Sequence, residues 1–418
     1  MSTSTSATAP TLALPLTEQT FPALAELVRK RGLMVGAGAI ALGLVIGRIS
    51  PATFFPAYLA VYLFFLGLGI GSLAILMLHY LVGGLWGFTI RRPLEAASMT
   101  LPVLALLFLP IALAVKALYP WANAEVVNES TALLHKSSYL NISFWLLRAL
   151  IYHAIWSGMA LVLRSGSKKQ DETEDPEPTW RTQALCAPGL ILVFFSVTFA
   201  MIDWGMSLEP EWWSTIYGVM LLIGFVLSAL CLTVTVASHL RGVRALSDVA
   251  TAEGFHDLGN LMLAFVMLWA YMSFSQYLIT WMGNLTEEVP WYIKRSAGGW
   301  RWLCGFLMIF HFFVPFFLLL MRENKRESTR LWRIALAVLG LQLVNDVWLI
   351  VPAFTGRPGG SAWYTLAVLL CVLPAAAGIG GLWAAAYAWL LASRPLLPRH
   401  DPMLAQSLAH DNHGGGGH

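Results

Sequence analysis

The 418-residue chain is 57% hydrophobic and only 12% charged, a composition that excludes an ordinary water-soluble globular protein. Repeated apolar stretches of about 20 residues or more are typical of transmembrane helices. The net charge of +3 gives no reason to expect nucleic-acid binding. The sequence therefore predicts an all-α integral membrane protein embedded in lipid.

We predict ten transmembrane spans from the apolar runs. They cover residues 33–49, 54–82, 98–118, 137–163, 183–203, 212–240, 256–281, 296–321, 328–351 and 361–393. Residues 1–32 are predicted to lie outside the membrane, with 21–31 along its surface. Residues 394–418 are predicted to form a disordered tail.

The basic residues are divided unevenly between the two sets of loops. Of 26 Lys and Arg residues, 18 fall on the side of the two termini and seven on the other side. The positive-inside rule then places both termini in the cytoplasm. The polar stretch SGSKKQDETEDPEPTW at 165–180 is predicted to be a solvated cytoplasmic loop.

The four cysteines lie inside or at the edges of apolar runs. They are Cys186, Cys231, Cys304 and Cys371, and no two are within three residues of each other. This spacing fits neither an iron–sulfur motif nor a covalent c-type haem attachment. We therefore expect buried thiols, no covalently bound cofactor and no metal site.

The fourth and fifth spans contain costly polar side chains. Arg148 and His153 lie within the fourth span, and Asp203 ends the fifth. Ionisable residues inside a membrane are candidates for proton transfer or ligand contact. Two other interpretations stay open: Arg148 can serve packing by pairing with a carboxylate, and His153 with His311 can form a bis-histidine haem site.

The seventh span carries a second group of polar candidates. His256 and Asp257 open it, while Ser273 and Gln276 interrupt its last third. Polar groups are costly in hydrocarbon unless they face protein, water or a ligand. This span is therefore predicted to contact a ligand or to contribute to a proton path.

The ninth span places Gln342, Asn345 and Asp346 on one helical face, because they are separated by three and four residues. Together with Gln276 and Asp203 they are predicted to define a polar pocket near the outer membrane surface. Interhelical hydrogen bonding is the alternative role of this face.

Four stretches resemble a known membrane subunit. They are LYPWAN (118–123), DWGMSLEPEWWSTIYG (203–218), FHDLGNLMLAFVMLWAYMSFSQYLITWMGNLTEEVPWYIKR (255–295) and LQLVNDVWLIVPAF (341–354). They are similar to the second of the two ten-span, quinone-binding subunits of bacterial alternative complex III, a quinol:cytochrome c oxidoreductase. The resemblance covers most of residues 33–393.

The resemblance implies the fold of the polysulfide-reductase-like (NrfD-like) membrane subunits. Two four-helix bundles are expected, from spans two to five (about 54–203) and six to nine (about 212–351), flanked by the first and last spans. It also implies a location in the bacterial cytoplasmic membrane and a non-redox role in scaffolding, quinone contact and proton passage.

The expected partners also follow from the resemblance. They are a sister ten-span subunit, a periplasmic iron–sulfur subunit, c-type cytochrome subunits and small membrane anchors. Haems and iron–sulfur clusters are expected on these partners, and menaquinone or ubiquinone as the diffusible ligand. Two other functions stay open: the quinone-reactive anchor of a molybdoenzyme or polysulfide-type reductase, and a secondary transporter.

Overall fold

The computed structural model describes residues 16–246, 249–355, 361–398, 400–404 and 407–408, and these contain helices and no strand. Ten helical segments are long and apolar enough to cross a membrane. They are α1 (Thr20–Ile49), α2 (Pro51–Val82), α3 to α5 (Leu85–Leu113), α9 (Ile142–Glu172), α10 with η2 (Glu177–Leu208), α11 (Tyr217–Leu240), α12 (Ala252–Gly283), α14 to α15 (Gly299–Leu320), α17 with α18 (Ser328–Thr355) and α19 (Ala362–Ala392). The chain is therefore an all-α, multi-pass membrane protein, as predicted.

Several spans are built from shorter helices, and short helices also occupy the connections. The composite spans contain α3 (Leu85–Ser98), α4 (Leu101–Leu107), α5 (Leu109–Leu113), η2 (Met206–Leu208), α14 (Gly299–Leu307), η4 (Met308–Phe313), α15 (Val314–Leu320), α17 (Ser328–Ile350) and α18 (Pro352–Thr355). The connections contain α6 (Val115–Leu118), η1 (Pro120–Ala122), α7 (Ala124–Glu129), α8 (Thr131–Lys136), η3 (Arg244–Leu246), α13 (Val289–Ser296) and α16 (Arg322–Arg326).

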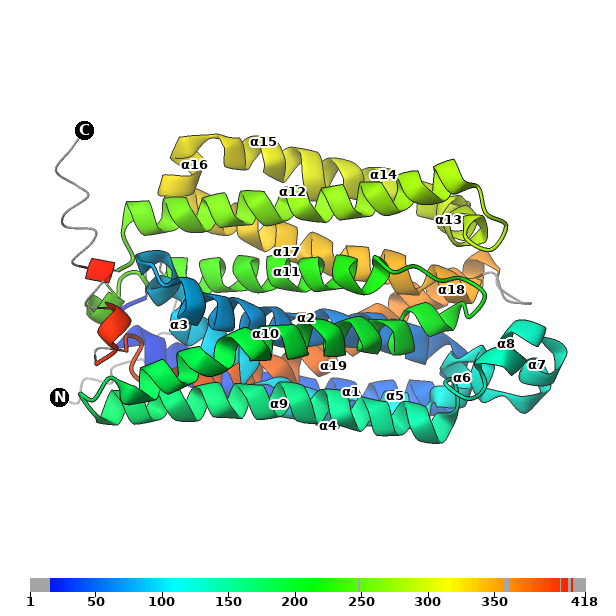
Figure 1. The fold of residues 1–418 in the computed structure, drawn as a ribbon, viewed down its shortest axis with the longest axis horizontal. Helices are drawn as coiled ribbons and strands as arrows, with labels where there is room; N and C mark the ends of the chain where they lie inside the picture. The colour runs from blue at the N-terminus through cyan, green and yellow to red at the C-terminus, as the bar shows by residue number, and fades with distance from the viewer. Residues whose placement is uncertain (1–15, 247–248, 356–360, 399, 405–406, 409–418) are drawn as a thin grey trace, which may run out of the picture.

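The spans form two bundles that meet along α2 and α11 (Figure 1). Bundle one contains α2, α3 to α5, α9 and α10, and bundle two contains α11, α12, α14 to α15 and α17. The helices α1 and α19 pack against each other and flank α2. This arrangement agrees with the predicted pair of four-helix bundles with flanking first and last spans.

Glycines let the two bundles approach closely. A Cβ on Gly71 of α2 would lie 2.1 Å from the carbonyl oxygen of Phe225 on α11, and one on Gly67 would lie 2.3 Å from the Phe225 ring. Small residues allow this kind of backbone contact between membrane helices. The junction between the bundles is therefore tightly packed.

The first helix begins earlier than predicted. Residues 21–31 are not a separate surface helix but the first turns of α1, which continues without a break to Ile49. Glu26 pairs with Arg29 at 2.7 Å and with Lys30 at 3.3 Å, and these i,i+3 and i,i+4 pairs support a continuous helix.

The end of the molecule where α1 begins and α19 ends, here called the near end, contains a buried ionic cluster. Arg91 on α3 pairs with Asp401 at 2.7 Å, and Arg92 pairs with Glu95 at 2.6 Å and with Asp171 at 2.5 Å. Because these charges are paired, α3 can begin at Leu85, although the sequence placed Arg91 and Arg92 in a loop before a span at 98.

The same cluster corrects two other boundaries. Arg394 pairs with Glu95 and Asp171, so the segment after α19 packs against bundle one, and the described part of the predicted disordered tail is ordered. The rest of that tail lies outside the described residues. The predicted loop 165–180 is mostly helical, because α9 reaches Glu172 and α10 begins at Glu177.

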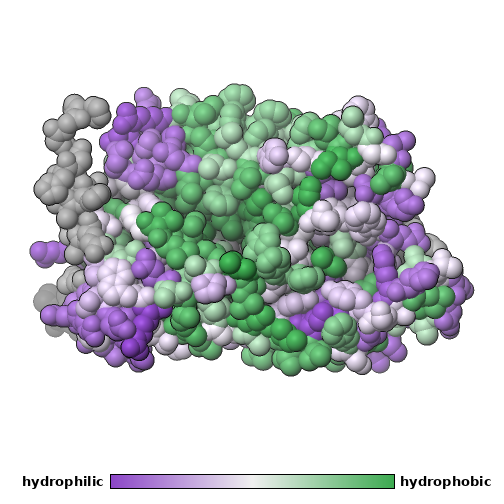
Figure 2. All heavy atoms as spheres, in the orientation of Figure 1, coloured by the Kyte–Doolittle hydropathy of each residue, from purple (hydrophilic) through white to green (hydrophobic). Residues whose placement is uncertain are grey.

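The surface carries the pattern of a protein that crosses a membrane. Figure 2 shows an apolar band around the middle of the molecule and hydrophilic residues at both ends. The far end, opposite the near end, carries α7, α8 and α13 (Figure 1).

Candidate functional site

Bundle two encloses a cavity of about 590 Å³ between α11, α12, α13, α14, η4 and α17. Aromatic and aliphatic side chains form most of its wall. The lining residues are Met220, Leu221, Trp269, Ala270, Ser273, Phe274, Tyr277, Trp291, Tyr292, Ser296, Cys304, Leu307, Met308, Phe312, Phe313, Gln342, Asn345, Trp348 and Leu349. A largely apolar wall with a few polar groups is typical of a small-molecule site.

Three residues predicted from the sequence meet in this cavity. Ser273 of α12 lines it together with Gln342 and Asn345 of α17. Gln342 and Asn345 are buried, at 2% and 4% exposed. The periodic face of the ninth span therefore borders a cavity that it shares with the seventh span.

The cavity opens to the surface of the molecule between α12 and η4. Phe274 and Tyr277 line it, yet they are 60% and 46% exposed on α12, a helix long and apolar enough to cross a membrane. Met308 and Phe313 on η4 also line it and are exposed. A lipid-soluble molecule can therefore approach the cavity from the membrane.

Asp346 lies directly behind the cavity wall. The Gln342 Nε2 group donates a hydrogen bond of 3.1 Å to Asp346 Oδ1. Neither Gln342 Oε1 nor Asp346 Oδ2 has a hydrogen-bond partner among the described residues, although both are buried. Buried polar atoms without partners are uncommon, so these two acceptors need an explanation.

His311 is a member of this region that the sequence did not assign to the pocket. It is fully buried in the π-helical turn η4, and its ring lies 4.2 Å from the ring of Trp269. Gln342 is its polar neighbour, and neither ring nitrogen has a hydrogen-bond partner in the described structure. Pro315 provides a reason for the turn, because it has no N–H to donate to the His311 carbonyl.

The short helix α13 closes the far end of the cavity. Its Trp291 lines the wall, and the Arg295 guanidinium lies 3.6 Å from the centre of the Trp291 ring. Arg295 also donates to Glu209 Oε2 at 2.9 Å and to the Leu349 carbonyl at 2.6 Å. Burial lowers the pKa of Arg295, and Glu209 opposes that effect. These bonds fix α13 over bundle two.

In bundle one, the predicted polar residues Arg148 and Asp203 are hydrogen-bonded to each other. Arg148 donates to Asp203 through Nε at 2.7 Å and Nη2 at 2.8 Å, and the Tyr152 hydroxyl donates to Asp203 at 2.9 Å. The Arg148 guanidinium also stacks 3.8 Å from the centre of the Tyr139 ring. Burial, followed by the nearby Asp203 carboxylate, raises the pKa of Tyr139 to about 12. Both Asp203 oxygens are therefore satisfied by protein.

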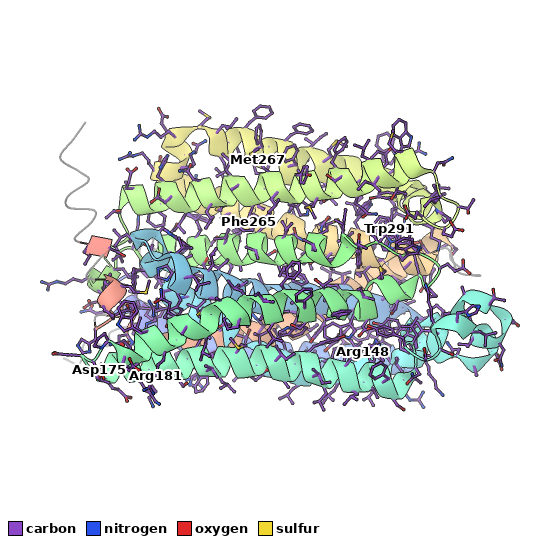
Figure 3. The ribbon with its side chains drawn as sticks, viewed as in Figure 1. Arg148, Asp175, Arg181, Phe265, Met267 and Trp291 are labelled. Carbon is purple, nitrogen blue, oxygen red and sulfur yellow. The ribbon has the colours of Figure 1, made fainter. Side chains whose placement is uncertain are left out.

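The predicted polar residues thus fall into two groups rather than one pocket. Asp203 is not among the residues that line the cavity, and its carboxylate partners all come from bundle one. Figure 3 shows Arg148 on α9 and Trp291 on α13, both in the far half of the molecule but in different bundles.

The two histidines of the haem hypothesis do not share a site. His153 is 3.2 Å from the Tyr62 hydroxyl, and its ring stacks on Trp204 with centroids 5.5 Å apart. His311 instead packs on Trp269 in bundle two. Within the described residues, no cluster of three or more metal-ligating side chains is present.

The remaining predicted residues lie on α12, outside the cavity. Gln276 is buried and accepts a hydrogen bond from Ser214 while donating to Thr280 at 3.3 Å. His256 lies 3.7 Å from Glu253 and 3.9 Å from Asp257 near the start of the helix, where Asp257 is exposed. These two groups are separated by an apolar stretch of α12.

The fold defines a multi-pass, all-α membrane protein, and bundle two contains a largely apolar cavity. Compared with known protein families and with curated proteins, the chain matches none.

Proposed function

We propose that this chain is a membrane subunit of a quinol-oxidising electron-transfer complex similar to alternative complex III, and that it binds a quinol or quinone in the bundle-two cavity. The cavity's access to the apolar surface between α12 and η4 carries the proposal. A long-tailed quinone is dissolved in the membrane, so its tail can stay among Phe274, Tyr277 and Phe313 while its head meets Gln342 and Asn345.

The resembling stretches also support this assignment. Residues 255–295 supply the α12 and α13 walls, and residues 341–354 supply Gln342, Asn345 and Trp348. Two of the four resembling stretches therefore build part of the cavity wall. In this proposal the protein lies in the bacterial cytoplasmic membrane with its near end toward the cytoplasm.

The chain's own contribution is to hold the ligand and to accept its protons. Oxidation of a quinol releases two electrons and two protons. The electrons are proposed to pass to haems and iron–sulfur clusters on partner subunits. Asp346 is hydrogen-bonded to the lining residue Gln342 and is the proposed proton acceptor, whereas the oxygens of Asp203 are already occupied by Arg148 and Tyr152.

Purification from native membranes tests the proposal. We expect an affinity-tagged chain to copurify with multihaem cytochrome c and iron–sulfur subunits, a second ten-span subunit and bound menaquinone or ubiquinone. Molybdenum in the preparation would instead assign the chain to a molybdoenzyme as its quinone-reactive anchor. A homogeneous oligomer of this chain without redox partners would contradict both and favour a transporter.

A further inference from the structure

A fourth guanidinium group lies beside the near-end ionic cluster. The three carboxylates of the cluster, on Glu95, Asp171 and Asp401, are already paired with the three guanidinium groups described above. Arg164 of α9 stands next to them, where Arg394, Glu95 and a second arginine of the cluster act on its charge. Among the described residues of this region, positive charges therefore exceed negative charges by one.

The Arg164 side chain has free donors. Of its three nitrogens, only Nη2 has a hydrogen-bond partner in the described structure, the Ser393 hydroxyl directly after α19 at 3.4 Å. Nε and Nη1 are accessible from outside the protein, unlike the buried Nε and Nη1 atoms of Arg91. A guanidinium presents its N–H groups in one plane, a geometry that matches the oxygens of a phosphate. The free donors of Arg164 can therefore bind a phosphate group.

Arg164 lies where the apolar part of α9 ends. The residues before it, ALVL at 160–163, are apolar, and the residues after it, SGSKKQ at 165–170, are polar. One turn before Arg164, Leu161 is exposed. One turn after it, the side chain of Lys168 is exposed and has only a long contact to a carboxylate, at 3.8 Å. This order of apolar and basic side chains is the one expected at the level of lipid phosphates.

The neighbouring helices continue the apolar side of this pattern. Trp389 on α19 is 58% exposed and lies one turn before Ser393, the residue that Arg164 contacts. Tryptophan is enriched at this depth in membrane proteins. Helix α4 packs against both α9 and α19 and carries the exposed Leu106. A phosphate bound at Arg164 would therefore have apolar surface beside it for acyl chains.

We propose that Arg164 binds the phosphate of an anionic phospholipid in the membrane leaflet at the near end, with Lys168 as a second cation. This inference is independent of the quinone site. A free phosphate could meet the same guanidinium, but the exposed Leu161 and Trp389 favour a ligand with acyl chains. Each basic side chain near the membrane surface is expected to strengthen the binding of an anionic lipid about five-fold.

Lipid retention by the full chain tests the inference. The purified protein in an uncharged detergent is incubated with graded amounts of phosphatidylglycerol or of phosphatidylcholine with the same acyl chains. The lipid retained per chain is measured after gel filtration. We expect phosphatidylglycerol to bind at least about 10-fold more tightly than phosphatidylcholine. Inorganic phosphate should displace no more of it than chloride at the same ionic strength, because inorganic phosphate has no acyl chain.

Three variants identify the residue responsible. Arg164→Gln removes the charge and should lower the preference for phosphatidylglycerol about five-fold. Arg164→Lys keeps the charge and should lower that preference by less than about two-fold. The control is Arg181→Gln, which removes a cation at the same end of α10 that Glu177 already neutralises at 2.6 Å (Figure 3). This control should keep the full preference.

Each contrary outcome overturns the inference. Equal retention of the two lipids by the wild-type chain shows that no anionic lipid is selected. An unchanged preference in folded Arg164→Gln protein, or an equal fall in Arg181→Gln, shows that the selection does not come from Arg164. Displacement of phosphatidylglycerol by inorganic phosphate assigns the guanidinium to a free phosphate instead of a lipid.

Discussion

The two bundles use buried polar residues in opposite ways. In bundle one, Asp203 receives three hydrogen bonds from Arg148 and Tyr152, and the group is closed by aromatic rings. In bundle two, Gln342 and Asp346 share one hydrogen bond, and Gln342 lines a cavity of about 590 Å³. A satisfied cluster holds helices together, whereas an unsatisfied cluster beside a cavity is suited to bind a ligand.

Removing the charge of Asp203 should give the largest effect on stability. We expect Asp203→Asn to lower the free energy of unfolding by about 3–5 kcal/mol, because it leaves the buried Arg148 without its counter-charge. Thermal unfolding of the purified protein in detergent measures this. The double variant Arg148→Met with Asp203→Leu should recover much of the loss, and a double variant as unstable as Asp203→Asn would contradict the ion-pair account.

Filling the cavity should weaken binding without loss of stability. Ala270 lines the wall, so we expect Ala270→Phe to weaken naphthohydroquinone binding at least about 10-fold, or about 1.4 kcal/mol. Fluorescence titration in nanodiscs measures this. The control, Ala264→Phe, places the same side chain on the exposed surface of α12 and should bind normally. Unchanged binding by Ala270→Phe would place the ligand elsewhere.

Deleting one hydroxyl from the closed cluster should have a smaller effect. We expect Tyr152→Phe to cost about 1 kcal/mol of stability, because one of the three hydrogen bonds to Asp203 is lost. Chemical unfolding in mixed micelles resolves a change of this size. Tyr271→Phe, at a tyrosine that is 64% exposed, is the matched control and should be neutral. Equal stabilities of the two variants would show that Asp203 does not depend on Tyr152.

The smallest change in stability is expected at the open cluster. Asp346→Asn should alter the free energy of unfolding by no more than about 1 kcal/mol, because Asp346 accepts a hydrogen bond from the neutral Gln342 amide and has no ion-pair partner among the described residues. The same variant should reduce quinol turnover in an assembled complex if Asp346 accepts protons. A loss of unfolding free energy as large as that expected for Asp203→Asn would contradict the proposed difference between the two bundles.

The sequence predicted the spans well where hydrophobicity alone defines them. The ninth span is an example, and the spacing of Gln342, Asn345 and Asp346 also placed them on one face. The start of the third span was missed because Arg91 is neutralised by Asp401, a partner far away in the chain. Single-sequence hydropathy has no access to such a pairing.

The sequence also did not predict that the polar residues would be divided between the two bundles. Similar depths suggested that Asp203 and Asp346 share a pocket, but depth does not specify which helices are neighbours. His311 was considered only as a haem ligand, although Pro315, four residues later, was a signal of a local break in helical geometry. The position of His311 in a π-helical turn depends on backbone geometry, which hydropathy does not describe.

The near-end ionic cluster has a consequence for biogenesis. Ribosomes deliver Arg91 long before Asp401, yet the two side chains are in contact in the finished protein. Until Asp401 has been synthesised, the Arg91 guanidinium lacks this carboxylate as a partner. The segment that follows α19 therefore completes the site where the third span is anchored. A nascent chain released before it would leave Arg91 with only its longer contact to Glu95, at 3.5 Å.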